Sequence, residues 1–277
     1  MILMDGKSLR NKILEEIKIK IAKDRIKTSL AIILVGDNEA SKIYIRNKVK
    51  ACEEVGIIPV TYLLPEETTE EELCVLIEKL NNDGTITGII LQSPVPKHIN
   101  FDKCSSLIKS YKDVDGFVMA NTYNLYLNDE KLVPCTVKAV IKLLEEYNIA
   151  LEGANVVIVG RGNIVGKPLS LALLNRNATV TIAHSKSKNL KDITKTADIL
   201  ISAVGKPKLI TNEMVKDNAV VIDVGISRVD GKVVGDIDFE SVSKKCSYIT
   251  PVPGGVGPMT VAMIMENVLI ANEMREK

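Results

Sequence analysis

Residues 156–187 constrain the fold of this chain more than any other stretch. They read as an apolar strand, a glycine-rich turn, a helix and a second strand. Gly160, Gly162 and Gly166 form the pattern G-x-G-x-x-x-G, a close variant of the dinucleotide fingerprint. Glycine lets the backbone approach a pyrophosphate, and the following helix points free N–H groups at the phosphates. A glycine turn without a ligand is the alternative, but its place between strand and helix favours a dinucleotide site.

The end of the second strand, Thr179–Ala183, favours NADP over NAD. An NAD site usually carries Asp or Glu roughly 20 residues beyond the glycines, where it accepts from the ribose 2′-hydroxyl. Here the strand is followed by His-Ser-Lys-Ser-Lys at 184–188, without an acid. Hydroxyl and ammonium donors there, together with Arg161, suit a 2′-phosphate. The alternative is that these cations are ordinary surface charge.

Length and composition predict a globular protein of two domains. A chain of 277 residues is too long for most single hydrophobic cores. Lys and Arg number 36 against 35 Asp and Glu, which gives no electrostatic footprint for nucleic acid. The apolar runs are too short to span a bilayer, and the first residues do not resemble a secretory signal. We therefore expect a cytoplasmic protein without nucleic-acid or membrane partners.

Cysteine and histidine usage argues against a disulfide framework and against a metal site. The two histidines, His98 and His184, have no ligand-spaced neighbour, so zinc is not expected. The five cysteines are scattered without a C-x-x-C pair, which is typical of reduced thiols: Cys52, Cys74, Cys104, Cys135 and Cys246. No Ser/His/Asp hydrolase elbow is present. An enzyme built on this chain must work with Lys, Tyr, Asp, Gln and backbone groups.

Strand and helix patterns alternate along both halves, which predicts an α/β protein with parallel sheets. Apolar strands are expected over 30–35, 60–64 and 88–92, then over 156–159, 179–183, 199–203 and 220–224. Helices are expected over 8–27, 40–55, 69–81, 101–109 and 136–147, and a final helix is expected to follow residues 249–260 and to end near residue 273. Thr69 and Glu72 form a capping box. We infer two α/β lobes with a cleft between them and ligands at the carboxyl ends of strands.

Ser41, Tyr44 and Lys48 have the spacing i, i+3 and i+7, which places them on one face of a helix. A lysine beside a tyrosine ring in a cleft is a candidate acid/base group. From spacing alone, a surface lysine beside a half-buried tyrosine is the commoner arrangement. Gln92 follows an apolar strand and precedes two prolines, a position from which an amide can orient a ligand.

Asp113 and Asp115 flank a valine in a turn that ends at Gly116. Alternate residues could direct one carboxylate inward, although a solvated turn is the commoner case. Spacing leaves the choice open.

Eight blocks of the chain carry a family resemblance. The chain resembles the bifunctional 5,10-methylenetetrahydrofolate dehydrogenase/5,10-methenyltetrahydrofolate cyclohydrolase family along nearly its whole length. The block at 250–260 is very specific, and eight matching blocks in the same order make coincidence implausible. They are VGDNEASKIYIRNKVKACEEVGI (35–57), GIILQSPVP (88–96), KDVDGF (112–117), PCT (134–136), VGRGNIVGKP (159–168), ATVTIAHSKS (178–187), VIDVGI (221–226) and TPVPGGVGPMT (250–260).

The resemblance implies a fold, an activity and an assembly. A folate-binding catalytic lobe would span 1–134, completed by a C-terminal helix over 259–277, and a Rossmann-like NADP lobe would span 135–258. Two long helices would link the lobes, and a homodimer would form through the NADP lobes. The implied activity is NADP-dependent oxidation of 5,10-methylenetetrahydrofolate to the methenyl compound and its hydrolysis to 10-formyltetrahydrofolate.

Site residues are implied in the same way. Tyr44 would stack on the folate, Lys48 would be the catalytic lysine, Gln92 would support it, and Asp115 would read the pterin edge. The implied substrate contacts are Ser41, Tyr44, Asp115, Pro253, Gly254 and Gly255. The implied NADP contacts are Gly160, Arg161, Gly162, Ser185 and Ile226.

Several positions depart from the family pattern. Gly162 stands where Ser is usual, which removes a hydroxyl near the cofactor phosphates. Ser93, Ser110 and Val137 replace a usual Leu, Pro and Pro. None of these changes removes an implied catalytic group, although the shape of the substrate loops could differ.

Two other functions are alternatives. A two-lobe NADP-dependent dehydrogenase of a small acid explains 150–230 equally well, but gives no reason for Lys48, Gln92 and the 250–260 loop together. A non-catalytic NADP-sensing module belongs to a different class, and an intact Lys48 argues against it.

Overall fold

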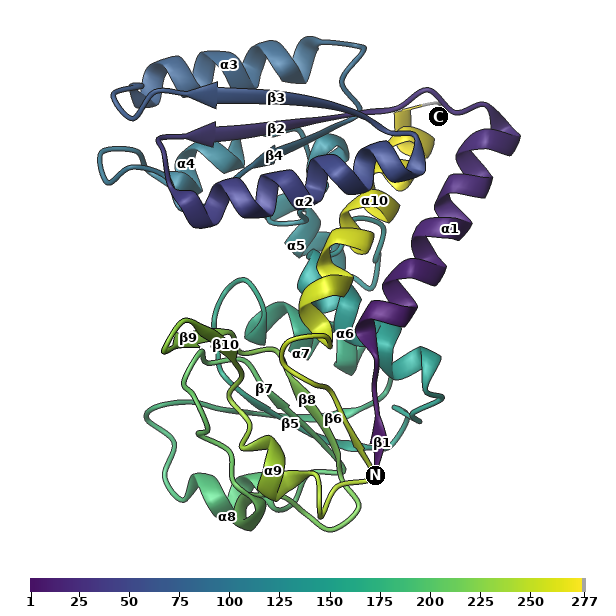
Figure 1. Cartoon of the computed structure of the whole chain (residues 1–277), viewed down its shortest axis with the longest axis vertical. Coiled ribbons are helices and arrows are strands. Elements are labelled where there is room, and N and C mark those ends of the chain that lie inside the picture. The colour runs from purple at the N-terminus through teal and green to yellow at the C-terminus, as the bar shows by residue number, and fades with distance from the viewer. Residues whose placement is uncertain (276–277) are drawn as a thin grey trace. The chain divides into compact units, whose positions relative to one another are not determined.

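The computed structural model describes residues 1–275, which form two compact units (Figure 1). Unit 1 comprises Met1–Arg10 and Thr136–Thr260, and unit 2 comprises Asn11–Cys135 and the C-terminal segment from Val261. Three helices contain the points at which the chain passes from one unit to the other: α1 (Gly6–Asp24), α6 (Cys135–Glu146) and α10 (Val256–Arg275).

By their contacts, residues 1–10 belong to unit 1. β1 (Ile2–Leu3) pairs in parallel with β11 (Tyr248–Ile249) at the edge of the unit 1 sheet. A two-residue strand carries no periodic pattern, so this pairing cannot be predicted from local sequence.

Unit 2 is built on a three-stranded parallel sheet in the order β3-β2-β4. The central strand β2 (Ser29–Val35) is buried throughout and lies between β3 (Ile58–Leu64) and β4 (Gly88–Leu91). The connections β2→β3 and β3→β4 run in opposite directions across the sheet. Since such crossovers are right-handed, α2 (Glu39–Val55) and α3 (Glu70–Asn82) cover opposite faces (Figure 1).

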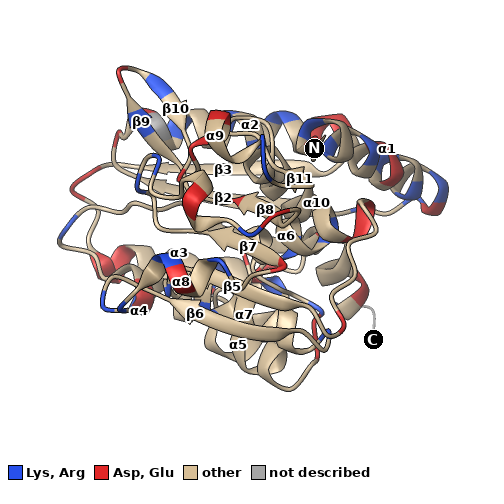
Figure 2. Ribbon diagram, turned by 90° about the horizontal axis from the view of Figure 1, so that it is seen from below, with Lys and Arg blue, Asp and Glu red and all other residues tan. Residues whose placement is uncertain are grey.

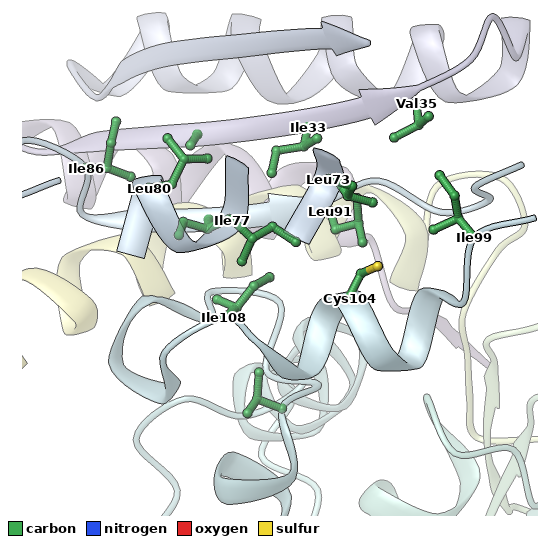
Figure 3. Close-up of a cluster of buried hydrophobic side chains, with 13 residues drawn as sticks. Ile33, Val35, Leu73, Ile77, Leu80, Ile86, Leu91, Ile99, Cys104 and Ile108 are labelled. Atoms are coloured by element: carbon green, nitrogen blue, oxygen red, sulfur yellow. The ribbon is translucent and has the colours of Figure 1, made fainter. Parts of the chain in front are cut away.

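An apolar cluster joins one face of this sheet to α3 and α4 (Phe101–Ser106), as Figure 3 shows. Alternate residues of β2 enter it, as a period of two requires, and α3 contributes residues at helical spacing. The cluster includes Ala31, Ile33, Val35, Ile89, Leu91, Leu73, Ile77, Leu80, Cys104 and Ile108. One face of the sheet is therefore covered by α3 and α4, and loops follow the strands at its carboxyl edge.

The end of unit 2 is fixed by α10. Asn267 is fully buried, and its side-chain amide donates to Val114 O at 2.9 Å and to Val133 O at 3.1 Å. The segment between these carbonyls includes α5 (Met119–Tyr126), and a 3₁₀ turn (Ser110–Lys112) precedes it. The amide therefore holds the turn that carries Asp115.

Unit 1 contains a parallel six-stranded sheet in the order β1-β11-β8-β7-β5-β6. Its other strands are β5 (Asn155–Val159), β6 (Thr179–Ala183), β7 (Ile199–Ser202) and β8 (Val220–Asp223). The chain passes from β5 through α7 (Gly166–Leu174) to β6, then returns through α8 (Leu190–Thr194) to β7 on the other side of β5. The strand order thus reverses between β5 and β7, where open α/β sheets bind ligands.

Unit 1 also contains short elements. An antiparallel hairpin, β9 (Ser227–Val229) and β10 (Lys232–Val234), follows β8, and α9 (Phe239–Val242) precedes β11. A 3₁₀ turn (Asn212–Met214) lies between β7 and β8. These elements were not predicted, because segments of two to five residues are too short for a periodic signal. The longer predicted strands and helices are confirmed, with ends that differ by a few residues.

Charges of both signs are interspersed along the elements, as α1 illustrates in Figure 2. Over residues 1–275, no helix combines the length and apolar character that crossing a membrane demands. Within the same residues all five cysteines are free thiols, and no cluster of His, Cys, Asp or Glu is arranged to hold a metal ion.

The capping box at the start of α3 gives a prediction about stability. Thr69 accepts from the Glu72 N–H at 3.2 Å, and the Glu72 carboxylate accepts from the Thr69 N–H at 2.8 Å. We expect Thr69→Ala to lower the free energy of unfolding by about 1 kcal/mol in urea titrations. Thr69→Ser keeps the hydroxyl and serves as the control. Equal loss in both variants would contradict a role for the cap.

Candidate functional site

The first candidate site lies at the carboxyl edge of the unit 2 sheet, just beyond β4. The backbone N–H of Gln92 donates to Ile33 O at 2.8 Å and so extends the ladder by one residue. Its side-chain Nε2 donates to Ser93 O at 2.8 Å. With the amide nitrogen occupied in this way, Oε1 remains as a fixed acceptor.

Lys48 reaches this acceptor from α2. Its Nζ donates to Gln92 Oε1 at 2.9 Å, and the residue is only 8% exposed. Among the described residues the ammonium group has this amide as its partner and no carboxylate in ion-pair contact. Because a buried, unpaired charge is costly, such lysines are uncommon in a purely structural role. The structure therefore excludes the surface-lysine alternative that the spacing left open.

The other two residues of the predicted helix face differ in accessibility. Tyr44, one turn before Lys48, is 50% exposed and offers its ring to a ligand. Ser41 is 1% exposed, and its backbone N–H donates to the side chain of Asn38, which caps α2, at 3.0 Å. In the part of the chain that is described, its hydroxyl oxygen is buried without a hydrogen-bond partner.

The structure distinguishes Asp113 from Asp115. The buried Asp113 carboxylate accepts from the N–H groups of Gly116 and Val118 at 3.0 and 2.7 Å, and from Asn121 Nδ2 at 2.9 Å. These bonds close the turn, so Asp113 has a structural role. The solvated turn that spacing favoured is not what forms.

Asp115 has a different environment. Its side chain is half-buried, and none of the other described residues donates a hydrogen bond to its carboxylate. Burial raises the pKa of this carboxyl group, and the positive charge of Lys48 acts in the opposite direction. Asp115 is therefore the carboxylate of this turn that remains free for a ligand.

Three predicted substrate contacts lie in unit 1, in the loop between β11 and α10. Gly254 has a φ of +118°, a conformation that favours glycine. The Gly255 N–H donates to Pro251 O at 2.8 Å, and a Cβ at Gly255 would lie 2.7 Å from the same oxygen. Pro253 is exposed at the tip. The two glycines are thus required by the backbone conformation of the loop, and Pro253 is the exposed residue beside them.

The second candidate site is the glycine turn after β5. Gly160 has a φ of +127°, and a Cβ there would lie 2.5 Å from Ala203 O at the end of β7. A Cβ on Gly166, which begins α7, would lie 2.2 Å from Gly160 O. By contrast, open space surrounds Gly162 within 4 Å. Two glycines close the turn and the third leaves room for a phosphate, so the turn fits a dinucleotide.

The end of β6 follows the glycine turn on the neighbouring strand, since Val159 pairs with Ala183. Beyond Ala183 a tight turn forms, in which the His184 N–H donates to Ser187 Oγ at 3.0 Å. Ser185 is exposed on this turn, as are Arg161 in the glycine turn and Ile226 after β8. The predicted cofactor residues therefore all belong to loops at the carboxyl edge of one sheet.

Sequence reasoning gave no role to Asp223, the last residue of β8. Its buried Oδ1 accepts from the N–H groups of Gly225 and Asp236 at 3.1 and 3.0 Å, and Oδ2 accepts from the Ile237 N–H at 2.9 Å. Burial raises the pKa of Asp223 to about 6 despite these bonds. An acid within the apolar run 220–224 was the signal that could have identified it.

Two family models match this chain. The model described as "Tetrahydrofolate dehydrogenase/cyclohydrolase, catalytic domain" matches residues 4–115. The model described as "Tetrahydrofolate dehydrogenase/cyclohydrolase, NAD(P)-binding domain" matches residues 134–276.

Relatives match over almost the whole chain. The "Bifunctional protein FolD" of Campylobacter concisus is 49% identical over 277 residues, which cover 99% of this chain and 98% of the relative. The protein of the same name from a Sulfurihydrogenibium species is 54% identical over 275 residues, which cover 97% and 96%.

Solved structures agree with this similarity. The bifunctional enzyme FolD from Campylobacter jejuni has a TM-score of 0.97 at 50% identity, over 99% of each chain. The Trypanosoma brucei methylenetetrahydrofolate dehydrogenase-cyclohydrolase, complexed with NADP and an inhibitor, has a TM-score of 0.94 at 35% identity, over 100% of this chain and 99% of that one. Shikimate dehydrogenase from Aquifex aeolicus shares only the fold, with a TM-score of 0.54 at 11% identity over 90% and 98%.

The raised pKa of Asp223 predicts a pH-dependent stability. With a pKa of about 6 in the folded protein and 3.8 as its ordinary value, the folded state binds this proton more tightly. The stabilisation is complete below the ordinary value and is lost as pH rises through the folded value. We expect Asp223→Asn to remove this dependence. The variant's free energy of unfolding relative to wild type should then increase by about 2 kcal/mol from about pH 4.5 to about pH 7.5.

Urea unfolding at several pH values measures this difference. Asp238→Asn, the same chemical change outside the hydrogen bonds of Asp223, is the matched control. A difference between Asp223→Asn and wild type that does not vary with pH would contradict the raised pKa.

Proposed function

The chain belongs to the tetrahydrofolate dehydrogenase/cyclohydrolase family, and from this premise we propose which residues perform its reactions. It is an enzyme of one-carbon folate metabolism that uses NADP to oxidise 5,10-methylenetetrahydrofolate to 5,10-methenyltetrahydrofolate. It also hydrolyses the methenyl compound to 10-formyltetrahydrofolate. The observation that carries the residue assignment is the 2.9 Å bond between buried Lys48 Nζ and Gln92 Oε1.

Unit 2 is the folate-binding catalytic lobe in this proposal. Tyr44 stacks on the folate, for which its half-exposed ring on α2 is the support. Asp115 accepts hydrogen bonds from the N–H groups on the pterin edge, because none of residues 1–275 donates a hydrogen bond to its carboxylate. Ser41 and the 253–255 loop (Pro253, Gly254, Gly255) complete the substrate contacts.

Unit 1 is the NADP-binding lobe. The cofactor phosphates lie over Gly160, Arg161 and Gly162, where open space at Gly162 and the start of α7 supply room and N–H donors. Ser185 takes the 2′-phosphate, since the residues after β6 include hydroxyl and ammonium donors and no acid. The Ile226 backbone and side chain border the same cofactor.

For the oxidation, the protein supplies position and charge. NADP held by Gly160, Arg161, Gly162, Ser185 and Ile226 would supply the acceptor for the hydride, whose departure leaves positive charge on the N5–C–N10 unit of the folate. Tyr44 and Asp115 hold the pterin in one orientation, and such positioning lowers the barrier to the transfer.

For the hydrolysis, the protein must handle protons. Water adds to the cationic methenyl carbon and loses one proton, which leaves a hydroxyl group on that carbon. The N5–C bond then breaks as N5 takes a proton and the hydroxyl group loses its proton, which gives the formyl group on N10. Lys48 moves the proton through its Nζ, which Gln92 Oε1 holds in place. An arginine at this position could not release a proton.

The conversion of Lys48 to Met tests this assignment. We expect Lys48→Met to reduce hydrolysis of methenyltetrahydrofolate by about 10²- to 10⁴-fold, the usual contribution of a general acid/base group. NADP binding, measured by equilibrium titration, should be unchanged. Wild-type NADPH formation from methylenetetrahydrofolate, with NADP and NAD compared in parallel, gives the reference activity.

Lys50→Met is the matched control, because Lys50 is an exposed lysine on the same helix. Full hydrolytic turnover in Lys48→Met would refute the role of Lys48. An equal loss of hydrolytic activity in Lys48→Met and Lys50→Met would mean that the substitutions disturb α2 as a whole.

The enzyme is proposed to act as a cytoplasmic homodimer that forms through unit 1. β6 is the outer strand of its sheet, so the far side of this strand has a row of backbone groups free to pair with another chain. Exposed apolar side chains lie beside it, Ile182 on the strand and Leu174 at the end of α7. The free cysteines agree with a reducing compartment.

Charges on this edge test the dimer. We expect Leu174→Lys combined with Ile182→Lys to shift the protein from dimer to monomer in sedimentation velocity, because like charges would face each other across the symmetric contact. Val75→Lys is the control, since Val75 is 65% exposed in unit 2. A wild-type protein that sediments as a monomer would contradict the proposal directly.

A further inference from the structure

The hydrogen bonds of Asp223 are half of a reciprocal arrangement that the reactions above do not use. Asp236, immediately after the β9–β10 hairpin and its following glycine, is fully buried and also carries a carboxylate. Its Oδ2 accepts from Ser202 Oγ and from the Val204 N–H, both at 2.8 Å, and its Oδ1 accepts from the Lys206 N–H at 2.7 Å. Two buried acids in one unit thus accept six hydrogen bonds, three each, and five of these come from backbone N–H groups.

Glycine makes the reciprocity possible. A Cβ on Gly225 would lie 2.0 Å from the Asp236 carboxylate, and a Cβ on Gly235 would lie 2.0 Å from the Asp223 carboxylate. Asp236 therefore packs against Gly225, two residues after Asp223. Asp223 packs against Gly235, the residue before Asp236. Any side chain at either glycine would displace a carboxylate.

Through side-chain or backbone groups, Asp223 and Asp236 form hydrogen bonds with three segments at the carboxyl edge of the unit 1 sheet. Asp236 binds the backbone that follows β7, and Asp223 binds the backbone that follows β8. The Asp223 N–H donates to Thr250 Oγ1 at 2.7 Å, which adds the segment after β11. A further bond from Ser227 Oγ to Gly205 O, at 2.9 Å, ties the first two segments together.

These segments border the glycine turn. The absent Cβ of Gly160 would lie 2.5 Å from Ala203 O and 3.3 Å from the Val204 side chain, so the glycine turn packs directly against the backbone after β7. Val204 is 41% exposed and Ile226 is 49% exposed, so the held segments end in surface side chains. The Val204 N–H that donates to Asp236 belongs to the residue after Ala203, whose carbonyl lies against Gly160.

We propose that Asp223 and Asp236 are positioning residues of the cofactor site, which fix the backbone at 203–206 and 224–226 against the glycine turn so that NADP meets a preformed surface. This inference rests on the proposed cofactor assignment of unit 1. Neither acid contacts the cofactor in this scheme. Both act through the N–H groups that they hold.

Substitutions at Asp236 test the proposal in the full-length enzyme. We expect Asp236→Ala to raise the KM for NADP at least tenfold, because three bonds to the loop after β7 are lost. Asp236→Asn keeps one acceptor oxygen and should raise it about threefold. Hydrolysis of methenyltetrahydrofolate, which needs no NADP, should change less than twofold in both variants.

Asp238→Asn is the matched control, an acid two residues away whose carboxylate instead accepts from Ser241 Oγ at 2.5 Å. Hydrogen–deuterium exchange of β5 and β7 reports whether unit 1 remains folded. A KM for NADP that stays at the wild-type value in folded Asp236→Ala would overturn the inference. So would unfolding of unit 1 in both Asp236 variants, which would make the pair a folding element.

The outcome is separable from the proposed function. NADP affinity is also measured directly by equilibrium titration, without folate. A wild-type enzyme that fails to oxidise methylenetetrahydrofolate would contradict the proposed function, whereas weaker NADP binding in the Asp236 variants alone would still support the positioning role.

Discussion

Parallel pairing of buried strands is the interaction on which both candidate sites depend. In each unit every central strand uses its N–H and C=O groups within the ladder, so the backbone at the strand ends has defined positions. Because the strands are parallel, the loops that follow them lie at one edge of each sheet. Gln92 follows β4 in unit 2, and Gly160 follows β5 in unit 1. Chemistry that needs fixed polar groups therefore appears at the carboxyl edges of two otherwise apolar sheets.

Lys48 shows how a charged group is retained in such an apolar surrounding. Its partner is an amide oxygen, which compensates part of the cost of burial, and no carboxylate among residues 1–275 forms an ion pair with the ammonium. A carboxylate at the position of Gln92 would bind the ammonium as an ion pair and hold its proton more firmly. The free carboxylate of Asp115 lies in the same unit, where the charge of Lys48 opposes the effect of burial on its pKa. The amide thus holds the Lys48 side chain in one orientation at the carboxyl edge of the sheet.

Long, periodic segments were predictable from the sequence, and reciprocal contacts were not. The apolar runs of β2, β5 and β8, the capping box of α3 and the glycine turn follow from local rules that involve neighbours a few residues apart. Spacing also placed Tyr44 and Lys48 on one helix face, but it could not show that Lys48 is buried, because that depends on Gln92, 44 residues away. The pairing of β1 with β11 and the bonds between Asp223 and the backbone of Asp236 likewise join segments that no pattern connects.

The paired acids of unit 1 raise the question of why a carboxylate is used where a neutral side chain would cost less to bury. Asp236 receives donors on both of its oxygens, from a hydroxyl and two backbone N–H groups. An asparagine has one acceptor oxygen, and its NH₂ group would face a backbone N–H as a second donor. Only an acceptor at both positions satisfies all three donors, and charge strengthens each bond. The cost of burying a carboxylate is visible in the raised pKa of Asp223. In exchange, the satisfied hydrogen bonds restrict the conformations of the loop backbone. Gly225 and Gly235 belong to the same device, because the space that each leaves open is occupied by the opposite carboxylate.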